Sequence, residues 1–155
     1  MNPPNTEDKV AKLTQALANG GLWSGLRYIN STTDYRFTGL YRFAGQTLRN
    51  VALFDRETPA TSSAPDVDTA LSYCSLMRIS GEPMAIADAP HDDRVEGHPS
   101  QTAVQAYCGI PLIDENGGVI GSLCHFSLRP TLLYDEDLEF LLRIPAVLQS
   151  AEVEY

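Results

Sequence analysis

The stretch that decides the fold runs from Val104 to Pro130 and reads VQAYCGIPLIDENGGVIGSLCHFSLRP. Two apolar runs flank the polar segment 114–118, which contains Asn116-Gly117. Asn-Gly between such runs is the strongest short-range signal for a β-hairpin, because both residues tolerate the positive φ of a tight reversal. The stretch therefore predicts two antiparallel strands joined by a tight turn at Asn116-Gly117.

The position of the turn also predicts which residues of the two strands face each other. A turn closed symmetrically about Asn116-Gly117 places Glu115 opposite Gly118, Cys108 opposite His125 and Gly109 opposite Cys124. Because side chains alternate between the faces of a strand, one face carries Tyr107, Gly109, Ser122 and Cys124, and the other carries Cys108, Ile110, Leu112, Leu123 and His125. The second face is the more continuously apolar, so we expect helices to cover it. The first face, with small residues beside a tyrosine hydroxyl, is expected to form the floor of a cavity.

The composition is that of an ordinary globular protein. The chain has 155 residues, of which 43% are hydrophobic and 20% charged, and this length suits one domain, expected over 1–155 with its core at about 7–150. The net charge of −9 disfavours nucleic acid or an anionic membrane as a partner. Neither an apolar run of the roughly 20 residues that span a bilayer nor a signal-peptide pattern is found, so a cytoplasmic location is expected.

The cysteines number three, Cys74, Cys108 and Cys124, and form no Cys-x-x-Cys pair. An odd number without that spacing fits a reducing compartment rather than a disulfide framework. Cys108 and His125 face each other in the predicted hairpin, but two ligands fall short of a structural zinc site. We therefore expect no metal and no cofactor.

Helical and strand patterns alternate along the rest of the chain. Apolar residues at helical spacing predict helices at 7–19 and 22–30, separated by Gly20-Gly21, and a closing helix at 134–150 that Pro145 should kink or interrupt. Alternating patterns predict strands at 35–43, 47–55 and about 84–87, and a short helix starts at Asp68 or Thr69 and runs through Leu76. The segments 56–68 and 88–103 are expected to be loops, and long connections of this kind are often functional.

The order of these elements and several motifs resemble the GAF family of small sensory domains, in its stand-alone bacterial form. Tyr73-Cys74 is similar to an aromatic-cysteine pair of that family. The segment 84–89 followed by Asp92-Asp93-Arg94 resembles its strand-then-Asp-Ala and Asp-x-Arg pattern, and 107–112 and 121–126 resemble its last two strands. The resemblance covers about Glu7 to Ser150. It implies an α+β fold of the GAF/PAS type: a central antiparallel sheet of five to six strands, with terminal helices on one face and ligand-covering loops and short helices on the other.

The resemblance also implies a small-molecule site between the sheet and the loops at 56–68 and 88–103. The residues it places there are Tyr73, Cys74, Asp88, Arg94, Tyr107, Ser122 and Cys124. Three subfamily signatures are missing from the chain: the cyclic-nucleotide motif, a Cys-His pair on a helix as in bilin-binding members, and the Gly-Val-Cys-Gly segment of the GAF-like enzyme that reduces free methionine sulfoxide. The motifs therefore do not identify the ligand.

Most of these site residues also have a structural interpretation. Cys74 serves either as a packing residue or as a pocket thiol that senses an oxidant or electrophile. Asp88 either stabilises a turn or points into the pocket. Arg94 either pairs with a nearby aspartate or binds an anionic ligand. The tyrosine rings are expected to pack, with their hydroxyls reaching water or a ligand.

The sequence is compatible with three functions. The leading hypothesis is a non-enzymatic sensory or regulatory module in signal transduction, which binds a small molecule and acts through a signalling partner protein. The alternatives are a thiol-dependent reductase of a small sulfoxide and a ligand-free scaffold for protein interaction. Helices at Glu7–Asn19 and Tyr134–Ser150 are expected to pair across a two-fold axis, which predicts a homodimer.

Overall fold

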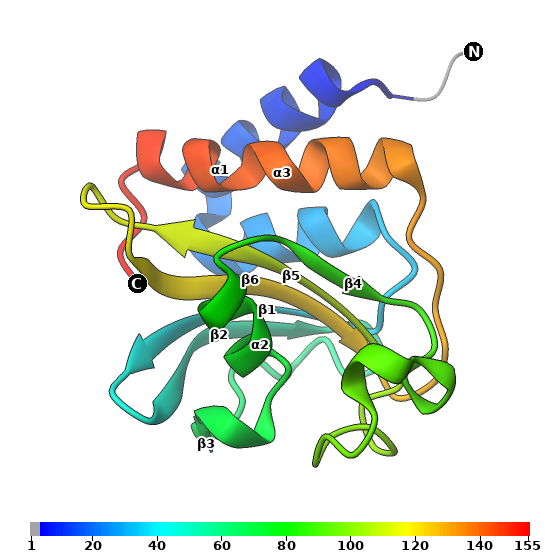
Figure 1. The fold of residues 1–155 in the computed structure, drawn as a ribbon. Helices are drawn as coiled ribbons and strands as arrows, with labels where there is room; N and C mark the ends of the chain where they lie inside the picture. Colours follow the sequence, from blue (N-terminus) through cyan, green and yellow to red (C-terminus); the bar gives the residue numbers. More distant parts are fainter. Residues whose placement is uncertain (1–3) are drawn as a thin grey trace.

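A six-stranded antiparallel sheet forms the centre of the computed structural model, which describes residues 4–155 (Figure 1). The strand order is β3-β2-β1-β6-β5-β4, so the two central strands come from distant parts of the chain. The strands are β1 (Phe37–Ala44), β2 (Thr47–Asp55), β3 (Val67–Asp68), β4 (Met84–Ile86), β5 (Ala106–Ile113) and β6 (Val119–Ser127). The α+β class and the number of strands predicted from the sequence are confirmed.

The hairpin of β5 and β6 has the predicted register over most of its length. Cys108 faces His125 and Gly109 faces Cys124. The turn is longer than predicted, since strand pairing stops at Ile113 and resumes at Val119. A one-residue shift between Leu112 and Ile113 absorbs the extra length, so the predicted pair of Glu115 and Gly118 is wrong while the pairs further along are right.

The turn is stabilised by one carboxylate. Asp114 Oδ1 accepts hydrogen bonds from the backbone N–H groups of Asn116 and Gly118, at 2.9 and 2.8 Å. Gly117 has φ of 82°, a left-handed conformation that glycine adopts without strain. The Asn-Gly signal therefore marked the right reversal, but Asp114 makes it a five-residue loop.

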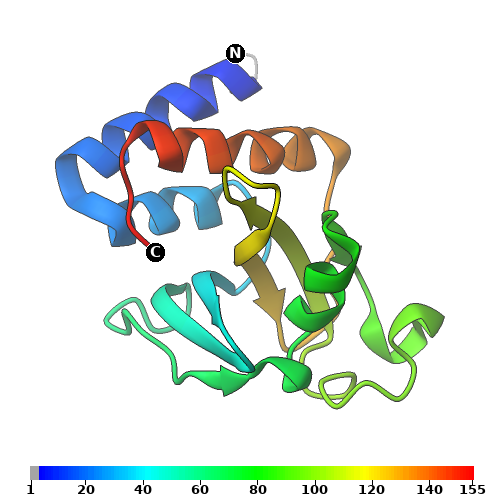
Figure 2. The same ribbon diagram turned by 60° about the vertical axis from the view of Figure 1, so that its left-hand side comes forward.

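Two helices, α1 (Thr6–Ser31) and α3 (Asp135–Ser150), cover one face of the sheet (Figure 1). Gly21, with φ of 75° and ψ of −165°, breaks α1 into two arms that point in different directions (Figure 2). These arms are the two helices predicted on either side of Gly20-Gly21. The predicted interruption at Pro145 is wrong, because α3 continues to Ser150.

Apolar packing holds these helices to the sheet. The side chains of Phe140, Leu141, Ile144 and Leu148 in α3 are fully buried, and each contributes about 1.5–3 kcal/mol of burial free energy. Two ion pairs join the first arm of α1 to α3, Lys9–Asp137 at 3.6 Å and Glu7–Arg143 at 2.7 Å. The second pair is largely exposed and adds little to stability.

The other face of the sheet carries the short helix α2 (Cys74–Ser80) and the long loops (Figure 2). The helix predicted from Asp68 or Thr69 through Leu76 is in fact two elements: a single 3-10 turn, η1 (Thr69–Leu71), and then α2. Asp68 caps the first of them by accepting a hydrogen bond from the Ala70 N–H at 2.9 Å. Two further 3-10 turns, η2 (Ala89–His91) and η3 (Asp93–Val95), follow β4.

The two faces of the sheet therefore bury two separate apolar clusters. The cluster under α1 and α3 includes Leu40, Cys108, Ile110, Leu112 and Leu123 from the strands. The cluster under α2 includes Tyr41, Phe43, Leu48, Tyr107 and Cys124. This is the assignment of faces predicted from the hairpin. Within residues 4–155, no helix is long and apolar enough to span a lipid bilayer.

Candidate ligand pocket

A pocket of about 220 Å³ lies on the sheet face away from α1 and α3. Its lining comes from the sheet, from the segment that leads into α2 and from the end of the loop before β5: Tyr41, Leu48, Val67, Leu71, Ser72, Tyr73, Ser100, Val104, Tyr107, Cys124 and Phe126. Of the residues predicted from the sequence, Tyr73, Tyr107 and Cys124 line it directly. The loops at 56–68 and 88–103 contribute Val67 and Ser100 to its walls.

Cys124 lies at the pocket floor between two tyrosine side chains. Its partners on the neighbouring strands are both glycines, Gly39 of β1 and Gly109 of β5. A Cβ added at Gly109 would lie 2.2 Å from the Tyr107 hydroxyl, and one added at Gly39 would lie 2.6 Å from the Tyr41 ring. The missing side chains therefore give both rings room to lie across the sheet beside the Cys124 thiol.

Cys74, at the start of α2, packs against the strands that form this floor. Its Sγ lies 3.0 Å from the Tyr107 hydroxyl and 3.6 Å from Ser122 Oγ. Interaction with Cys124, and to a smaller degree hydrogen bonding by Ser72, Tyr107 and Ser122, lowers the pKa of Cys74 against the effect of burial. Interaction with Cys74 and burial raise the pKa of Cys124. Of the two thiols, Cys74 therefore loses its proton more readily.

Tyr73 closes one wall of the pocket. Its hydroxyl donates a hydrogen bond to the carbonyl of Val104 at 2.9 Å, which ties the start of α2 to the segment before β5. Its ring meets that of Tyr107 edge to face at 5.4 Å and that of His98 at 4.7 Å. Burial raises the pKa of Tyr73 to about 12, so the hydroxyl stays neutral and holds the wall in place.

A comparison of the sequence with known families decides the family. The sequence model of the GAF domain matches residues 24–148. The chain belongs to the GAF domain family. No curated protein matches it.

Solved structures share the fold of this GAF domain. The GAF domain of the phosphoenolpyruvate-protein phosphotransferase from Acinetobacter is 14% identical, with a TM-score of 0.73 and 99% of both chains covered. Free methionine-R-sulfoxide reductase from Neisseria meningitidis, in complex with its substrate, is 13% identical, with a TM-score of 0.70 and coverage of 94% of this chain and 87% of that one. The chromophore-binding domain of a bacteriophytochrome from R. palustris is 13% identical, with a TM-score of 0.71 and coverage of 99% and 65%. At these identities the likeness concerns the fold alone.

Four of the seven predicted site residues are not in the pocket lining of this GAF domain: Cys74 and Ser122, which contact each other, and Asp88 and Arg94. Arg94 binds Asp92 through a contact of 2.6 Å and donates a second hydrogen bond to the Ala85 carbonyl at 2.7 Å. Asp88 Oδ2 contacts His91 Nδ1 at 3.0 Å on an exposed 3-10 turn. For both Arg94 and Asp88, the structure therefore shows pairing with a nearby side chain, which is the structural alternative considered from the sequence. The carboxylate of Asp92 is also the reason that the pKa of Arg94 is raised.

Cys108 and His125 lie on the opposite face, under α1 and α3. Burial raises the pKa of the Cys108 thiol to about 12 and lowers that of His125 to about 3. Both groups are therefore neutral, and they form no thiolate–imidazolium pair. Within residues 4–155, no three His, Cys, Asp or Glu side chains are grouped closely enough to hold a metal ion.

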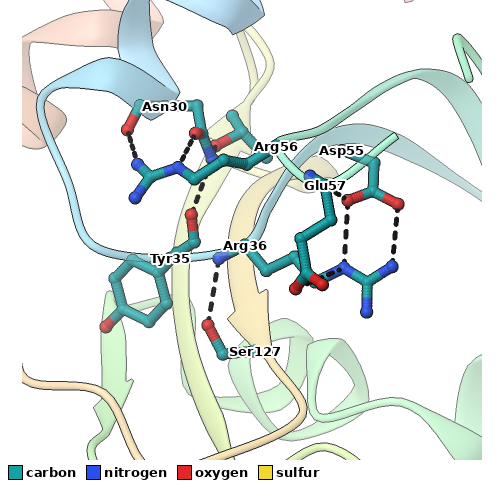
Figure 3. Close-up of polar contacts among 8 residues, drawn as sticks. Asn30, Tyr35, Arg36, Asp55, Arg56, Glu57 and Ser127 are labelled. Atoms are coloured by element: carbon teal, nitrogen blue, oxygen red, sulfur yellow. Dashed lines mark hydrogen bonds and ion pairs between the residues drawn. The ribbon is translucent and has the colours of Figure 1, made fainter. Parts of the chain in front are cut away.

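A polar network at one end of the sheet was not predicted from the sequence (Figure 3). Asn30, near the end of α1, donates hydrogen bonds to the Tyr35 carbonyl and to Thr38 Oγ1, both at 3.0 Å, and accepts one from Arg56 Nε at 3.0 Å. Arg36 donates two hydrogen bonds to Asp55, at 3.0 and 3.1 Å. A polar pocket of about 310 Å³ opens beside this network, but Arg36 and Arg56, which line it, already have partners inside the protein.

The sequence reasoning also missed much of the pocket lining. Leu48, Val67, Leu71, Val104 and Phe126 are apolar residues of strands and loops. Nothing in their local pattern separates a residue that faces a cavity from one that faces the core. A signal does exist for Tyr41, another lining residue that was missed: Gly39 two residues before it in β1 leaves the space that its ring fills, since a glycine in a central strand marks space needed by another group.

Proposed function

We propose that this GAF domain is a non-enzymatic sensory module that binds a small, neutral and mostly apolar molecule in the 220 Å³ pocket. The observation that carries the proposal is the pocket itself, which lies between the sheet and its covering loops. Within residues 4–155, its lining contains no Asp, Glu, Lys, Arg or His side chain. A charged ligand would lose its hydration there without gaining a partner of opposite charge.

The size of the pocket limits the ligand further. An apolar cavity of about 150 Å³ holds a benzene molecule, so about 220 Å³ admits a single ring with a small substituent or a small fused bicycle. Aromatic side chains of Tyr41, Tyr73, Tyr107 and Phe126 line it and favour stacked or edge-to-face contact with such a ring. Phenol and indole are therefore suitable probes.

Blocking the pocket tests this proposal. We expect Leu71→Trp to abolish the rise in melting temperature that phenol or indole produces, since Leu71 lines the pocket and is 54% exposed, so that the larger ring has room to fold into it. For the unmodified protein, ligand at about 100 times its Kd should raise the melting temperature by roughly 5–10 °C. Differential scanning fluorimetry measures both, and benzoate serves as the charged counterpart that should not bind.

The matched control is Ile79→Trp, on the outer side of α2, where the side chain is 85% exposed and outside the pocket. This variant should respond to the probes as the unmodified protein does. An equal response of Leu71→Trp would contradict the proposal. If no neutral compound raises the melting temperature, and native mass spectrometry finds no co-purified molecule, the ligand-free scaffold is the better interpretation.

The pocket is connected to α1 through a series of side-chain contacts. Phe126 lines the pocket and stacks on Phe37 at 4.6 Å between ring centroids. The guanidinium of Arg36 lies 4.6 Å from the Phe37 ring and pairs with Asp55. The residue after Asp55, Arg56, donates hydrogen bonds to Asn30 in the last turn of α1. Ligand binding is therefore expected to slow amide hydrogen exchange in residues 22–31, which gives the proposed signal a measurable route.

The reductase alternative has a specific test. The two thiols at the pocket floor supply the chemistry for it, but free methionine sulfoxide is a zwitterion, and the lining described above offers neither charge a partner. We expect no turnover of free methionine sulfoxide with dithiothreitol as reductant. Steady-state turnover that is lost in Cys74→Ala and in Cys124→Ala would establish the enzyme instead.

We also propose that the domain acts as a cytoplasmic homodimer that passes its state to a signalling protein. The outer surfaces of α1 and α3 are the expected interface, and Leu142 of α3 is 48% exposed there. Sedimentation velocity at micromolar concentrations should show a dimer, and Leu142→Glu should shift it toward monomer while Ile79→Glu does not. A monomer throughout would contradict this part alone.

A further inference from the structure

Two of the three cysteines meet at the floor of the pocket. Cys74 begins α2, and its sulfur reaches the sheet beside Tyr107 and Ser122. Cys124 lies two residues beyond Ser122 on β6, so both of these side chains point to the same face of the sheet. The Tyr107 hydroxyl, 3.0 Å from Cys74 Sγ, lies over Gly109, the residue that pairs with Cys124 across the two strands of the hairpin. The two cysteine side chains are therefore neighbours, although they are far apart in the sequence.

Only one of the two sulfurs faces the pocket. Cys124 belongs to the lining, between the rings of Tyr41 and Tyr107. Cys74 lies behind the Tyr107 hydroxyl and has 1% of its surface exposed. A small molecule in the pocket therefore meets Cys124 first and Cys74 second.

The surroundings of the pair stabilise a negative charge. The Tyr107 hydroxyl, at 3.0 Å, can donate a hydrogen bond to the Cys74 sulfur. Ser122 Oγ accepts one from the Cys74 thiol at 3.6 Å and can donate one in turn when that thiol has lost its proton. A thiolate is the nucleophilic form of cysteine, and a Cys74 thiolate can accept the proton of its neighbour Cys124. The charge can thus reach the sulfur that faces the pocket.

From this geometry we infer that Cys74 and Cys124 form a redox couple, which a small organic hydroperoxide entering the pocket converts to a disulfide. The inference goes beyond the proposed function, because it requires access of the oxidant and not a stably bound ligand. The compact pair at the end of an apolar pocket favours an alkyl or aryl hydroperoxide over a charged oxidant.

The chemistry proceeds in two steps. The Cys124 thiolate, after passing its proton to Cys74, attacks the outer oxygen of the hydroperoxide. The O–O bond breaks, Cys124 becomes a sulfenic acid, and the alkoxide takes the proton from Cys74 and leaves as the alcohol. The Cys74 thiolate then attacks the Cys124 sulfur, the S–S bond forms, and hydroxide leaves. The two sulfurs lose two electrons in total, and the hydroperoxide gains them.

The third cysteine provides an internal control. Cys108 faces α1 and α3 on the other side of the sheet, fully buried, and burial raises its pKa to about 12. It should therefore remain a thiol when the couple is oxidised. Cys108→Ala removes it without touching the pocket.

Thiol counting after oxidation tests the inference. The reduced protein is treated with cumene hydroperoxide, denatured and alkylated with N-ethylmaleimide, and its intact mass is measured. We expect the mass of a chain that carries one N-ethylmaleimide group and has lost two hydrogens, whereas the untreated protein carries three such groups. Reduction with dithiothreitol before alkylation should restore all three alkylated thiols. Peptide mapping of the oxidised Cys108→Ala variant should show Cys74 linked to Cys124. On a denaturing, non-reducing gel the oxidised protein should run as a single chain.

Three further variants separate the disulfide couple from a general effect of oxidation. Cys74→Ala and Cys124→Ala should each abolish the disulfide, and circular dichroism checks that they are folded. Tyr107→Phe keeps the ring and removes the hydroxyl, so oxidation should slow by about tenfold through loss of one charge-assisted hydrogen bond. Three alkylated thiols after treatment, overoxidation of Cys124 without a disulfide, or a disulfide between chains would each overturn the inference. None of these outcomes changes the test with phenol and indole, so the two proposals fail separately.

Discussion

Asn30→Ala is expected to lower the free energy of unfolding by about 2–4 kcal/mol, because it leaves several buried polar groups without partners. Asn30 is 1% exposed and satisfies the Tyr35 carbonyl, the Thr38 hydroxyl and Arg56 Nε at once (Figure 3). Tyr35 and Thr38 are buried as well. Water cannot easily replace the lost amide, so the desolvation cost of these groups falls on the folded state.

Urea unfolding monitored by circular dichroism measures this effect. Ser31→Ala is the matched control, since the next residue of α1 is exposed and its hydroxyl bonds to the carbonyl of Tyr28 within the same helix. It should change the free energy of unfolding by less than about 0.5 kcal/mol. Similar values for the two variants would show that the network in Figure 3 does not hold α1 to the sheet.

Gly121→Ala is expected to cost about 1–3 kcal/mol, as overpacking of a well-packed interior does. Gly121 is a residue of β6 that pairs with Arg42 of β1 and Leu112 of β5. A Cβ there would lie 2.4 Å from the backbone oxygen of Tyr41. Because that atom belongs to a central strand, it cannot move aside as a side chain could, and the two strands must separate locally.

The comparison for this prediction is Gly118→Ala in the hairpin turn. A Cβ at Gly118 would approach the Asp114 carboxylate at 3.3 Å, which is an adjustable side chain at the surface. Its effect on urea unfolding should be clearly smaller. Faster amide exchange at Tyr41 and Arg42 in Gly121→Ala would locate the damage at the β1–β6 pairing, whereas an unchanged midpoint would contradict the close approach of the two strands.

The sequence predicted those parts of the fold that depend on local geometry. The Asn-Gly signal and the two-residue period of β-strands were enough to place Cys108 opposite His125 and to assign the two faces of the hairpin. Gly20-Gly21 was enough to divide α1 into two arms. In each case a turn or a break of a few residues sets the local geometry, and the regular period of the flanking element carries it along the chain.

Other features depend on contacts between distant segments, and these were not predictable. The strand β3 has two residues and exists because it pairs with Thr47 and Leu48. Arg94 was a candidate for the pocket, yet the carboxylate two residues before it provides a nearer partner. The network around Asn30 joins α1, β1 and the end of β2, and no local pattern indicates that these three points meet.

The central place of β1 beside β6 has a consequence for synthesis of the protein. Tyr41 pairs with Ser122, so the middle of the sheet closes only after most of the polypeptide has left the ribosome. Until then β1 and β2 present an open hydrogen-bonding edge, which invites association between nascent chains. Folding that waits on such remote pairing is slow for a protein of this size, and production at lower temperature should therefore improve the recovered yield.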